Sequence, residues 1–293
     1  MENLRGAMLM VISMAGFALE DLAIKILART MPPGQIIVLL GLCGALGFSL
    51  LARAQRAPVF SPAFLARPVV LRNLGEMVGT MAMVMALALV PLSLASAILQ
   101  GLPLMVTLGA ALFLGEQVGW RRWTAIAFGF AGMLLILRPF GAGFDPNALW
   151  AVVTVVALAM RDVATRRVVR GTSSVQLAVW GFAAIVPAGV VMTAMQGGPV
   201  MPTAAGIGLI AVTVGFGMAA YWCLTSANRL GDIAFIAPFR YSRLIFAIAL
   251  GVLVLHEDLD APMLAGAGLI IGSGLYSLWR ERRRTLSSAR ASR

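Results

Sequence analysis

Residues 86–137 read ALALVPLSLASAILQGLPLMVTLGAALFLGEQVGWRRWTAIAFGFAGMLLIL. This stretch contains an apolar run that is longer than most core helices, then a Gly-Glu turn with two arginines, then a second apolar run. The same design returns near the C-terminus, where residues 229–278 read RLGDIAFIAPFRYSRLIFAIALGVLVLHEDLDAPMLAGAGLIIGSGLYSL. Glu116 in the first stretch corresponds to Glu257 in the second, 141 positions further along the chain.

The offset of 141 also relates polar residues far outside these two stretches. Coincident polar residues are scarce in so apolar a chain, so they indicate a repeat more strongly than apolar matches do. The pairs are Asp21 with Asp162, Lys25 with Arg166, Arg29 with Arg170, and Gln35 with Gln176. We interpret the chain as two copies of one unit, residues 1–140 and 145–280, followed by a basic tail, residues 281–293, that we expect to be disordered.

The composition indicates that lipid surrounds most of the chain. Of the 293 residues, 60% are hydrophobic and only 12% are charged, whereas soluble domains carry about 25% charged residues. The net charge of +11 does not indicate nucleic-acid binding here, because the basic residues lie between apolar runs and in the tail. Two cysteines inside apolar segments and a single histidine predict neither a disulfide framework nor a metal site.

Ten segments are long and apolar enough to cross a membrane as helices, which takes about 20 residues. The sequence therefore predicts an all-α integral membrane protein with ten transmembrane helices. The predicted segments are residues 5–27, 35–53, 69–90, 93–114, 121–138, 147–168, 174–195, 204–227, 233–255 and 261–279.

The arginines and lysines predict the orientation of these helices. With the N-terminus inside, 18 basic residues fall on the inner side and only three, Lys25, Arg29 and Arg138, on the outer side. Basic residues accumulate on the cytoplasmic side of membrane proteins. Both termini are therefore predicted to be cytoplasmic.

Five helices per copy is an odd number, so the second copy is predicted to cross the membrane in the opposite direction to the first. Inverted repeats are a common construction of secondary transporters, whose substrate binds between the halves near the middle of the membrane. A duplicated unit can also build a stable bundle that transports nothing, and a membrane scaffold of this kind remains the alternative.

Charged side chains inside the spans predict gates or structural ion pairs, because a charge at the bilayer centre costs about 2.5–3.5 kcal/mol on insertion scales. We expect Asp21 to pair with Lys25 beside Glu20 on the first helix, and Asp162 with Arg166 on the sixth. A bridge between Glu76 and Arg240 is expected because the two lie at similar depth. Arg243 lies deeper with no obvious acidic partner, so it is predicted to bind a substrate carboxylate or to cap backbone carbonyls.

The substrate site is predicted where the two copies differ, because a small-molecule substrate has no two-fold symmetry. The offset of 141 relates Thr80 to Tyr221, Met81 to Trp222, Gln100 to Tyr241, and Leu102 to Arg243. Aromatic walls with a few polar groups suit small, partly apolar ligands. The predicted cavity residues are Thr80, Met81, Gln100, Tyr221, Trp222, Tyr241 and Arg243, although packing alone would also explain Tyr221 and Trp222.

Pro103 and Pro238 interrupt the fourth and ninth helices and are predicted hinges. The chain has no His-Glu-x-x-His, Gly-x-Ser-x-Gly or phosphate-binding Gly-Lys-Ser/Thr motif. We therefore expect no enzymatic activity and no cofactor, and transport driven by gradients.

The block at residues 86–137, with its small-residue helix, proline, Gly-Glu turn and Gly-rich closing helix, resembles the repeat of the drug/metabolite transporter superfamily, EamA type. The second copy keeps Pro238, Glu257 and the glycines from Gly266 to Gly274, but has His256 where the family often has glycine. The chain looks most similar to the YddG-like aromatic amino acid exporters.

That resemblance implies a ten-helix fold with a central cavity, working by alternating access in a bacterial inner membrane. It implies export of aromatic and other neutral amino acids by a monomer that contacts only its substrate and lipid. Export of drugs or other metabolites such as purines is the alternative within the superfamily.

Overall fold

The computed structural model describes residues 2–56, 58–59, 61–116, 119–139, 141, 143–169, 171–230 and 233–291, and every regular element in these ranges is a helix. The first half contains α1 (Glu2–Leu27), α2 (Pro33–Ala54), η1 (Pro62–Leu65), α3 (Arg67–Leu89), α4 (Leu92–Leu99), α5 (Leu102–Leu114) and α6 (Trp120–Leu137). The second half contains η2 (Pro146–Ala148), α7 (Leu149–Thr165), α8 (Ser174–Met195), α9 (Ala204–Leu230), α10 (Ile233–Ile236), η3 (Ala237–Tyr241), α11 (Ser242–Leu255) and α12 (Ala261–Ala291). The predicted all-helical class is confirmed.

Nine helical stretches of the described residues are long and apolar enough to cross a membrane. They coincide with nine of the ten predicted segments. The fifth predicted segment is α6, whose first turn carries Arg121 and Arg122, and it is not among the nine. Beyond the last predicted segment, α12 continues to Ala291, through most of the tail that the sequence predicts as disordered.

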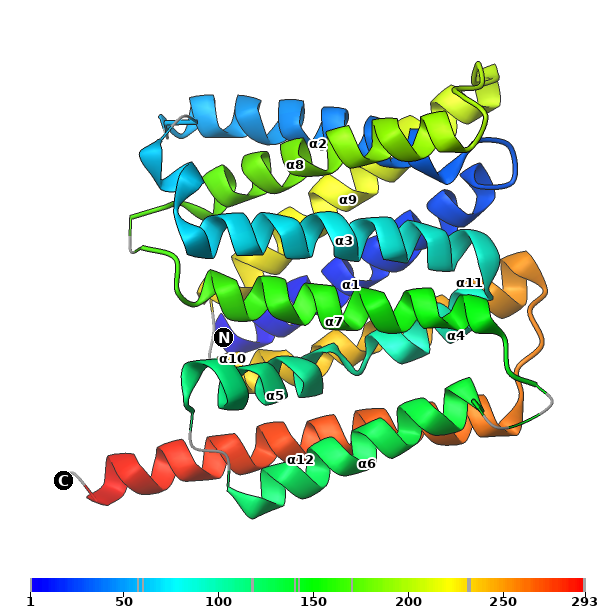
Figure 1. Cartoon of the computed structure of the whole chain (residues 1–293). Coiled ribbons are helices and arrows are strands. Elements are labelled where there is room, and N and C mark those ends of the chain that lie inside the picture. The colour runs from blue at the N-terminus through cyan, green and yellow to red at the C-terminus, as the bar shows by residue number, and fades with distance from the viewer. Residues whose placement is uncertain are drawn as a thin grey trace.

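The helices of the two halves run in opposite directions. Helix α1 begins at the end of the bundle where α12 terminates, whereas α7 runs back toward that end (Figure 1). We call this end the inner end and the opposite one the outer end. The antiparallel course of α1 and α7 is what an odd number of helices per repeat requires.

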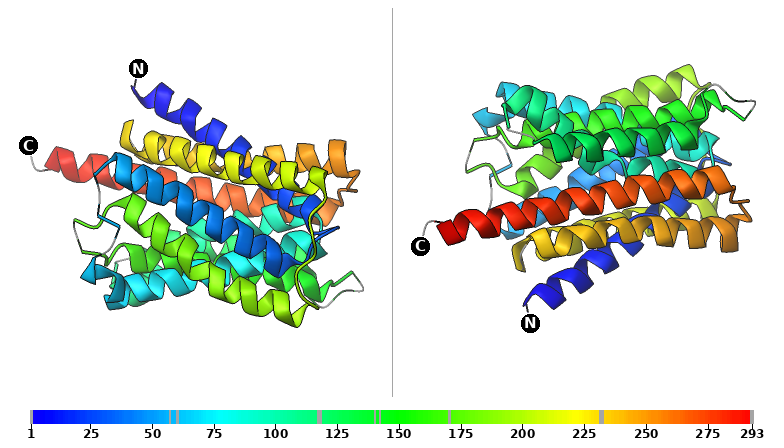
Figure 2. Two further views of the ribbon diagram at one scale, coloured as in Figure 1. Left: turned by 90° about the horizontal axis from the view of Figure 1, so that it is seen from above. Right: turned by 90° about the horizontal axis from the view of Figure 1, so that it is seen from below.

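The packing of the helices has the same two-fold pattern. Helix α1 packs on α9 as its counterpart α7 packs on α3, while α2 pairs with α8 and α6 with α12 (Figures 1 and 2). Every long helix of the first half therefore packs against a helix of the second half. The main hydrophobic core lies along these contacts, with Leu87, Ile98 and Ile270 fully buried.

The ends of α5 and α11 show the repeat at the level of single residues. Gly115 after α5 has φ of 69° and His256 after α11 has φ of 56°, both left-handed. The next amide, Glu116 N, donates to Ala110 O at 3.3 Å, and Glu257 N donates to Gly251 O at 2.9 Å. Glycine adopts this conformation without strain, so the histidine at the second site occupies a backbone position that favours glycine.

Glycines bring the two halves close together. A Cβ at Gly75 on α3 would lie 2.7 Å from Ala157 O on α7, and one at Gly132 on α6 would lie 2.6 Å from Gly266 O on α12. A Cβ at Gly274 on α12 would overlap the Tyr241 hydroxyl. Small residues at such positions let membrane helices approach closely, so Gly75 and Gly132 set the spacing between the repeats and Gly274 makes room for Tyr241 within the second repeat.

The fourth and ninth predicted spans are both interrupted. Helices α4 and α5 meet at Gln100 and Gly101, with Pro103 in the first turn of α5. In the second half, Pro238 lies in η3, between α10 and α11. Breaks of this kind are tolerated at membrane depth where they are enclosed by protein or line a water-filled cavity. The breaks coincide with the predicted hinges, whose movement stays a prediction.

Candidate functional site

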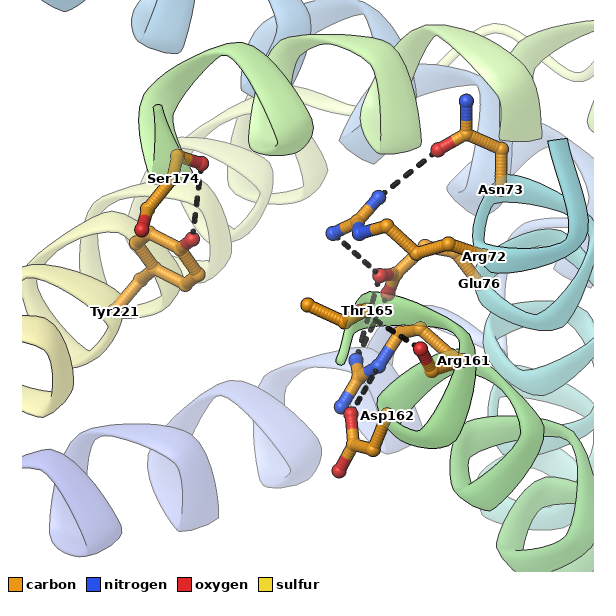
Figure 3. Close-up of polar contacts among 8 residues, drawn as sticks. All are labelled: Arg72, Asn73, Glu76, Arg161, Asp162, Thr165, Ser174 and Tyr221. Atoms are coloured by element: carbon orange, nitrogen blue, oxygen red, sulfur yellow. Dashed lines mark hydrogen bonds and ion pairs between the residues drawn. The ribbon is translucent and has the colours of Figure 1, made fainter. Parts of the chain in front are cut away.

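Three polar residues on the first turns of α3 form the base of the site. Arg72 Nη2 donates to Glu76 Oε2 at 3.3 Å, one helical turn away, and Arg72 Nη1 donates to Asn73 Oδ1 at 2.9 Å (Figure 3). Both Arg72 and Asn73 are buried. The apolar bundle thus holds a charged pair at its inner end, where the close α3–α7 contact at Gly75 encloses it.

Helix α7 of the second half completes this network. Arg161 Nη1 donates to Glu76 Oε1 at 3.2 Å, and Arg161 Nε donates to Asp162 Oδ1 at 2.9 Å (Figure 3). Arg72, Glu76, Arg161 and Asp162 therefore form one chain of charges, which we call the inner network. Its links between α3 and α7 join the two repeats.

The structure corrects the predicted bridge between Glu76 and Arg240. Glu76 is occupied by Arg72 on its own helix and by Arg161 on α7. Similar depth was the only basis for the predicted bridge, and depth does not determine which way a helix face points. Sequence reasoning missed Arg72 and Arg161; the i, i+4 spacing of Arg72 and Glu76 was the available signal.

Aromatic side chains lie beside the inner network. The Phe48 ring on α2 stacks on Phe182 of α8 at 5.5 Å and meets Tyr221 of α9 edge-on at 4.9 Å. The Tyr221 hydroxyl lies 3.4 Å from Ser174 O (Figure 3). Thr80 follows Glu76 by one turn on the same face of α3 and is partly buried. Tyr221 and Thr80 therefore lie beside the inner network, and their role as cavity residues stays a prediction.

Arg240, in η3, lies inside the bundle and is nevertheless accessible. Protein surrounds its guanidinium group, with Asp162 and Arg161 within electrostatic reach, yet the residue is exposed. The side chain is therefore accessible although charged groups of α7 lie near it. Arg240 makes no hydrogen bond or ion pair with any residue that the structure describes.

A second buried ion pair joins the halves further toward the outer end. Arg243 on α11 donates to Asp21 Oδ2 on α1 from Nη2 at 2.7 Å and from Nε at 3.1 Å. Only 4% of the Asp21 side chain is exposed. The predicted Asp21–Lys25 pair is therefore wrong, and Arg243 has the acidic partner that depth counting failed to find. Lys25 instead donates to Leu87 O and Val90 O, the last carbonyls of α3.

The outer ends of the two halves are locked together by Glu257. Its carboxylate accepts hydrogen bonds from Leu92 N at 2.6 Å, Ser93 N at 3.0 Å and Ser93 Oγ at 2.7 Å, at the first turn of α4. An acidic group here satisfies free amides and complements the helix dipole. Leu92 and Ser93 are fully buried. In the sequence analysis Glu257 served only to align the two repeats, so this capping contact was not predicted.

At the inner end the counterpart of Glu257 makes a different contact. Glu116 pairs with Arg166 at 2.6 Å, and about half of each side chain is exposed. The predicted pair of Asp162 with Arg166 is therefore replaced by Asp162 with Arg161. The half-buried Glu257 thus binds fully buried residues at one end of the bundle, whereas its equivalent Glu116 forms an exposed pair at the other.

The remaining predicted residues are dispersed. Gln100 is buried and donates to Ser96 O at 3.2 Å. Tyr241 is buried with its ring against α12. Trp222 is 59% exposed, on the side of α9 away from the Ala220 contact with α1. The structure does not bring these three to the inner network. Met81 packs against the main core, and the Glu20 carboxylate lies against Gly217 of α9.

Known proteins of similar sequence are membrane transporters. The S-adenosylmethionine uptake transporter of Rickettsia bellii is 28% identical over 214 residues, which cover 73% of this chain and 73% of that protein. The riboflavin transporter of Rhizobium johnstonii is 31% identical over 206 residues, 70% of this chain and 68% of that protein. One crystal structure matches with a TM-score of 0.61 at 20% identity, covering 93% of this chain and 98% of that chain, which supports the fold alone.

Membrane-crossing helices that enclose charged groups, together with these relatives, define a multi-pass membrane transporter of the bacterial inner membrane. The chain belongs to the EamA-like transporter family, which it matches over residues 4–138 and again over residues 146–279. The family predicted from the sequence is confirmed. The named relatives carry S-adenosylmethionine and riboflavin, so they do not single out the aromatic amino acid exporters.

Proposed function

We propose that the chain is a secondary transporter that works by alternating access between two inverted halves, with both termini and the inner end of the bundle facing the cytoplasm. The distribution of arginine and lysine supports this orientation. In this orientation α6 is the tenth membrane-crossing helix, because its neighbour α12 crosses the membrane beside it.

The observation that carries the proposal is the unequal state of Glu257 and Glu116. Glu257 holds the first turn of α4 at the outer end, whereas Glu116 forms a half-exposed pair at the inner end. A two-fold related pair of contacts in two different states is expected of a carrier that is closed on one side and open on the other. We assign the structure to the cytoplasm-facing form of the transport cycle.

The proposed substrates are small metabolites that carry an α-amino acid group, many of them together with a ring. Aromatic and other neutral amino acids are the first candidates, and S-adenosylmethionine, which also carries an α-amino acid group, is the second. The inner network, with charges of both signs beside Phe48, Phe182 and Tyr221, supports this choice. Net export of amino acids is supported by the sequence resemblance; a carrier driven by gradients transports in either direction.

Proteoliposomes test the proposed function. Vesicles preloaded with unlabelled phenylalanine are expected to take up external labelled phenylalanine in a saturable way, because exchange requires only that the carrier alternate. Labelled S-adenosylmethionine and riboflavin are measured in parallel, with protein-free vesicles and an entrapped sugar as leak controls. Riboflavin flux alone would contradict the proposed substrate class. No protein-dependent flux of any of the three would favour the scaffold.

A further inference from the structure

Arg240 differs from the arginines of the inner network because no described residue forms an ion pair with it. Arg72 and Arg161 both bind Glu76, and Arg161 also binds Asp162. Arg240 adds a third guanidinium to the same region, and no carboxylate of the described residues forms an ion pair with it. Unpaired charges inside the membrane are rare and mark functional sites.

The neighbouring elements leave the Arg240 guanidinium free. Arg243, one turn further along, is bound to Asp21 and turned toward α1. Tyr241 is packed against α12. On α7, Asp162 is within electrostatic reach of Arg240 but not in ion-pair contact with it. No described residue therefore accepts a hydrogen bond from Arg240, whose side chain is exposed.

The Asp162 carboxylate can accept further hydrogen bonds. Only its Oδ1 accepts a hydrogen bond, from Arg161, and about a third of its side chain is exposed. An accessible guanidinium thus lies within electrostatic reach of an accessible carboxylate oxygen, without an ion pair between the two described residues. An α-amino acid head group has a carboxylate and an ammonium group on one carbon atom, so it would fit between the two. Guanidinium groups bind carboxylates through two parallel hydrogen bonds.

The geometry points to Arg240 and Asp162 as the site that binds the head group of the substrate, with Arg240 on the carboxylate and Asp162 on the ammonium group. This assignment rests on the proposed transport function and specifies its substrate class as zwitterionic. In the first repeat Leu99 occupies the position equivalent to Arg240, so the first repeat has no matching guanidinium. The pairing is thus confined to one side of the pseudo-two-fold axis, as binding one asymmetric substrate requires.

The test uses competitors that lack one of the two charges. Uptake of labelled phenylalanine into proteoliposomes is inhibited with phenylalanine, with phenethylamine, which lacks the carboxylate, and with 3-phenylpropanoate, which lacks the ammonium group. In the unmodified protein, phenylalanine is expected to compete at least about tenfold better than either analogue, because each lost charge-assisted contact corresponds to about a tenfold change in affinity or more.

The variants then assign each charge to a residue. R240Q is expected to weaken inhibition by phenylalanine and by 3-phenylpropanoate by about tenfold. Inhibition by phenethylamine should stay unchanged. D162N is expected to weaken inhibition by phenylalanine and by phenethylamine. Inhibition by 3-phenylpropanoate should stay unchanged. R29Q, at an exposed arginine of the outer end, is the matched control. It should leave inhibition by all three competitors unchanged.

Two results would overturn the assignment. One is an R240Q protein that discriminates among the three competitors as the unmodified protein does. The other is an equal loss of inhibition by all three competitors in both R240Q and D162N. If R240Q does not elute as a single species in size-exclusion chromatography, R240K is used in its place. R240K must then weaken inhibition by phenylalanine and leave inhibition by phenethylamine unchanged. A failure of phenylalanine flux in the unmodified protein would instead overturn the proposed function, so the two failures are distinguishable.

Discussion

Asp21→Ala is expected to reduce the stability of the folded protein by about 3–5 kcal/mol, the usual effect of removing one partner from a buried ion pair. The loss arises because Arg243 would lose the only carboxylate among the described residues that binds it, and its guanidinium carbon would keep the Phe17 ring at 5.2 Å and Glu20 within electrostatic reach. The change should appear as a large fall in the thermal unfolding midpoint of the purified protein in detergent.

A double variant separates the ion pair from the general effect of altering the core. Leu102 occupies the position in the first repeat that Arg243 occupies in the second, so D21A with R243L replaces the ion pair with two apolar residues, one of which the first repeat already carries. Replacing a buried pair with apolar residues is often neutral or stabilising. We expect the thermal unfolding midpoint of the double variant to lie close to that of the unmodified protein. A D21A protein as stable as the unmodified one would contradict a structural role for this pair.

Glu257→Ala is expected to open the outer end of the bundle. The substitution removes three hydrogen bonds to a charged carboxylate, each contributing about 1.5–3 kcal/mol. Leu92 at this contact is fully buried. In a background without Cys43 and Cys223, an L92C protein carrying E257A should react with an external membrane-impermeant maleimide more than about tenfold faster than L92C alone.

Glu116→Ala is the matched control, because the repeat places Glu116 at the equivalent position of the opposite end. Its pair with Arg166 is half exposed, and exposed pairs contribute about 0–1 kcal/mol. E116A should therefore leave the labelling of L92C almost unchanged. Equal acceleration by E257A and E116A, or none by either, would show that Glu257 does not hold the outer end closed.

The repeat and the helices were predictable because they depend on features that a linear sequence carries directly. Apolar length predicts a span whatever the helix packs against, and nine of the ten predicted spans meet the criteria of length and composition. A shared offset predicts a shared local structure, as the left-handed residues Gly115 and His256 show. The EamA family follows from the same blocks and is confirmed.

The ion pairs were not predictable to the same degree. Asp21 and Lys25 have the spacing of a helical pair, yet Asp21 binds Arg243, 222 positions away, and Lys25 binds backbone carbonyls. The rotation of each helix about its axis decides such pairings, and that rotation follows from packing across the two halves. The same limit applies to Trp222 and Tyr241, whose residue types suit a cavity although their helix faces point elsewhere.

The substrate could not be predicted from the repeat motifs, which are shared by transporters with different substrates. The relatives named for S-adenosylmethionine and riboflavin match over similar shares of the chain. Arg240 is informative because it belongs to this chain's own asymmetry: the aligned position of the first repeat is Leu99.

Distances across the two ends of the bundle test alternating access most directly. Spin labels at Thr30 and Asp258 report on the outer end, and labels at Arg121 and Thr172 on the inner end; all four residues lie outside the membrane-buried core. On addition of a transported substrate, alternating access predicts a new population in which the outer pair is further apart and the inner pair closer together. Both pairs changing in the same sense, or neither changing under conditions of measured flux, would contradict it.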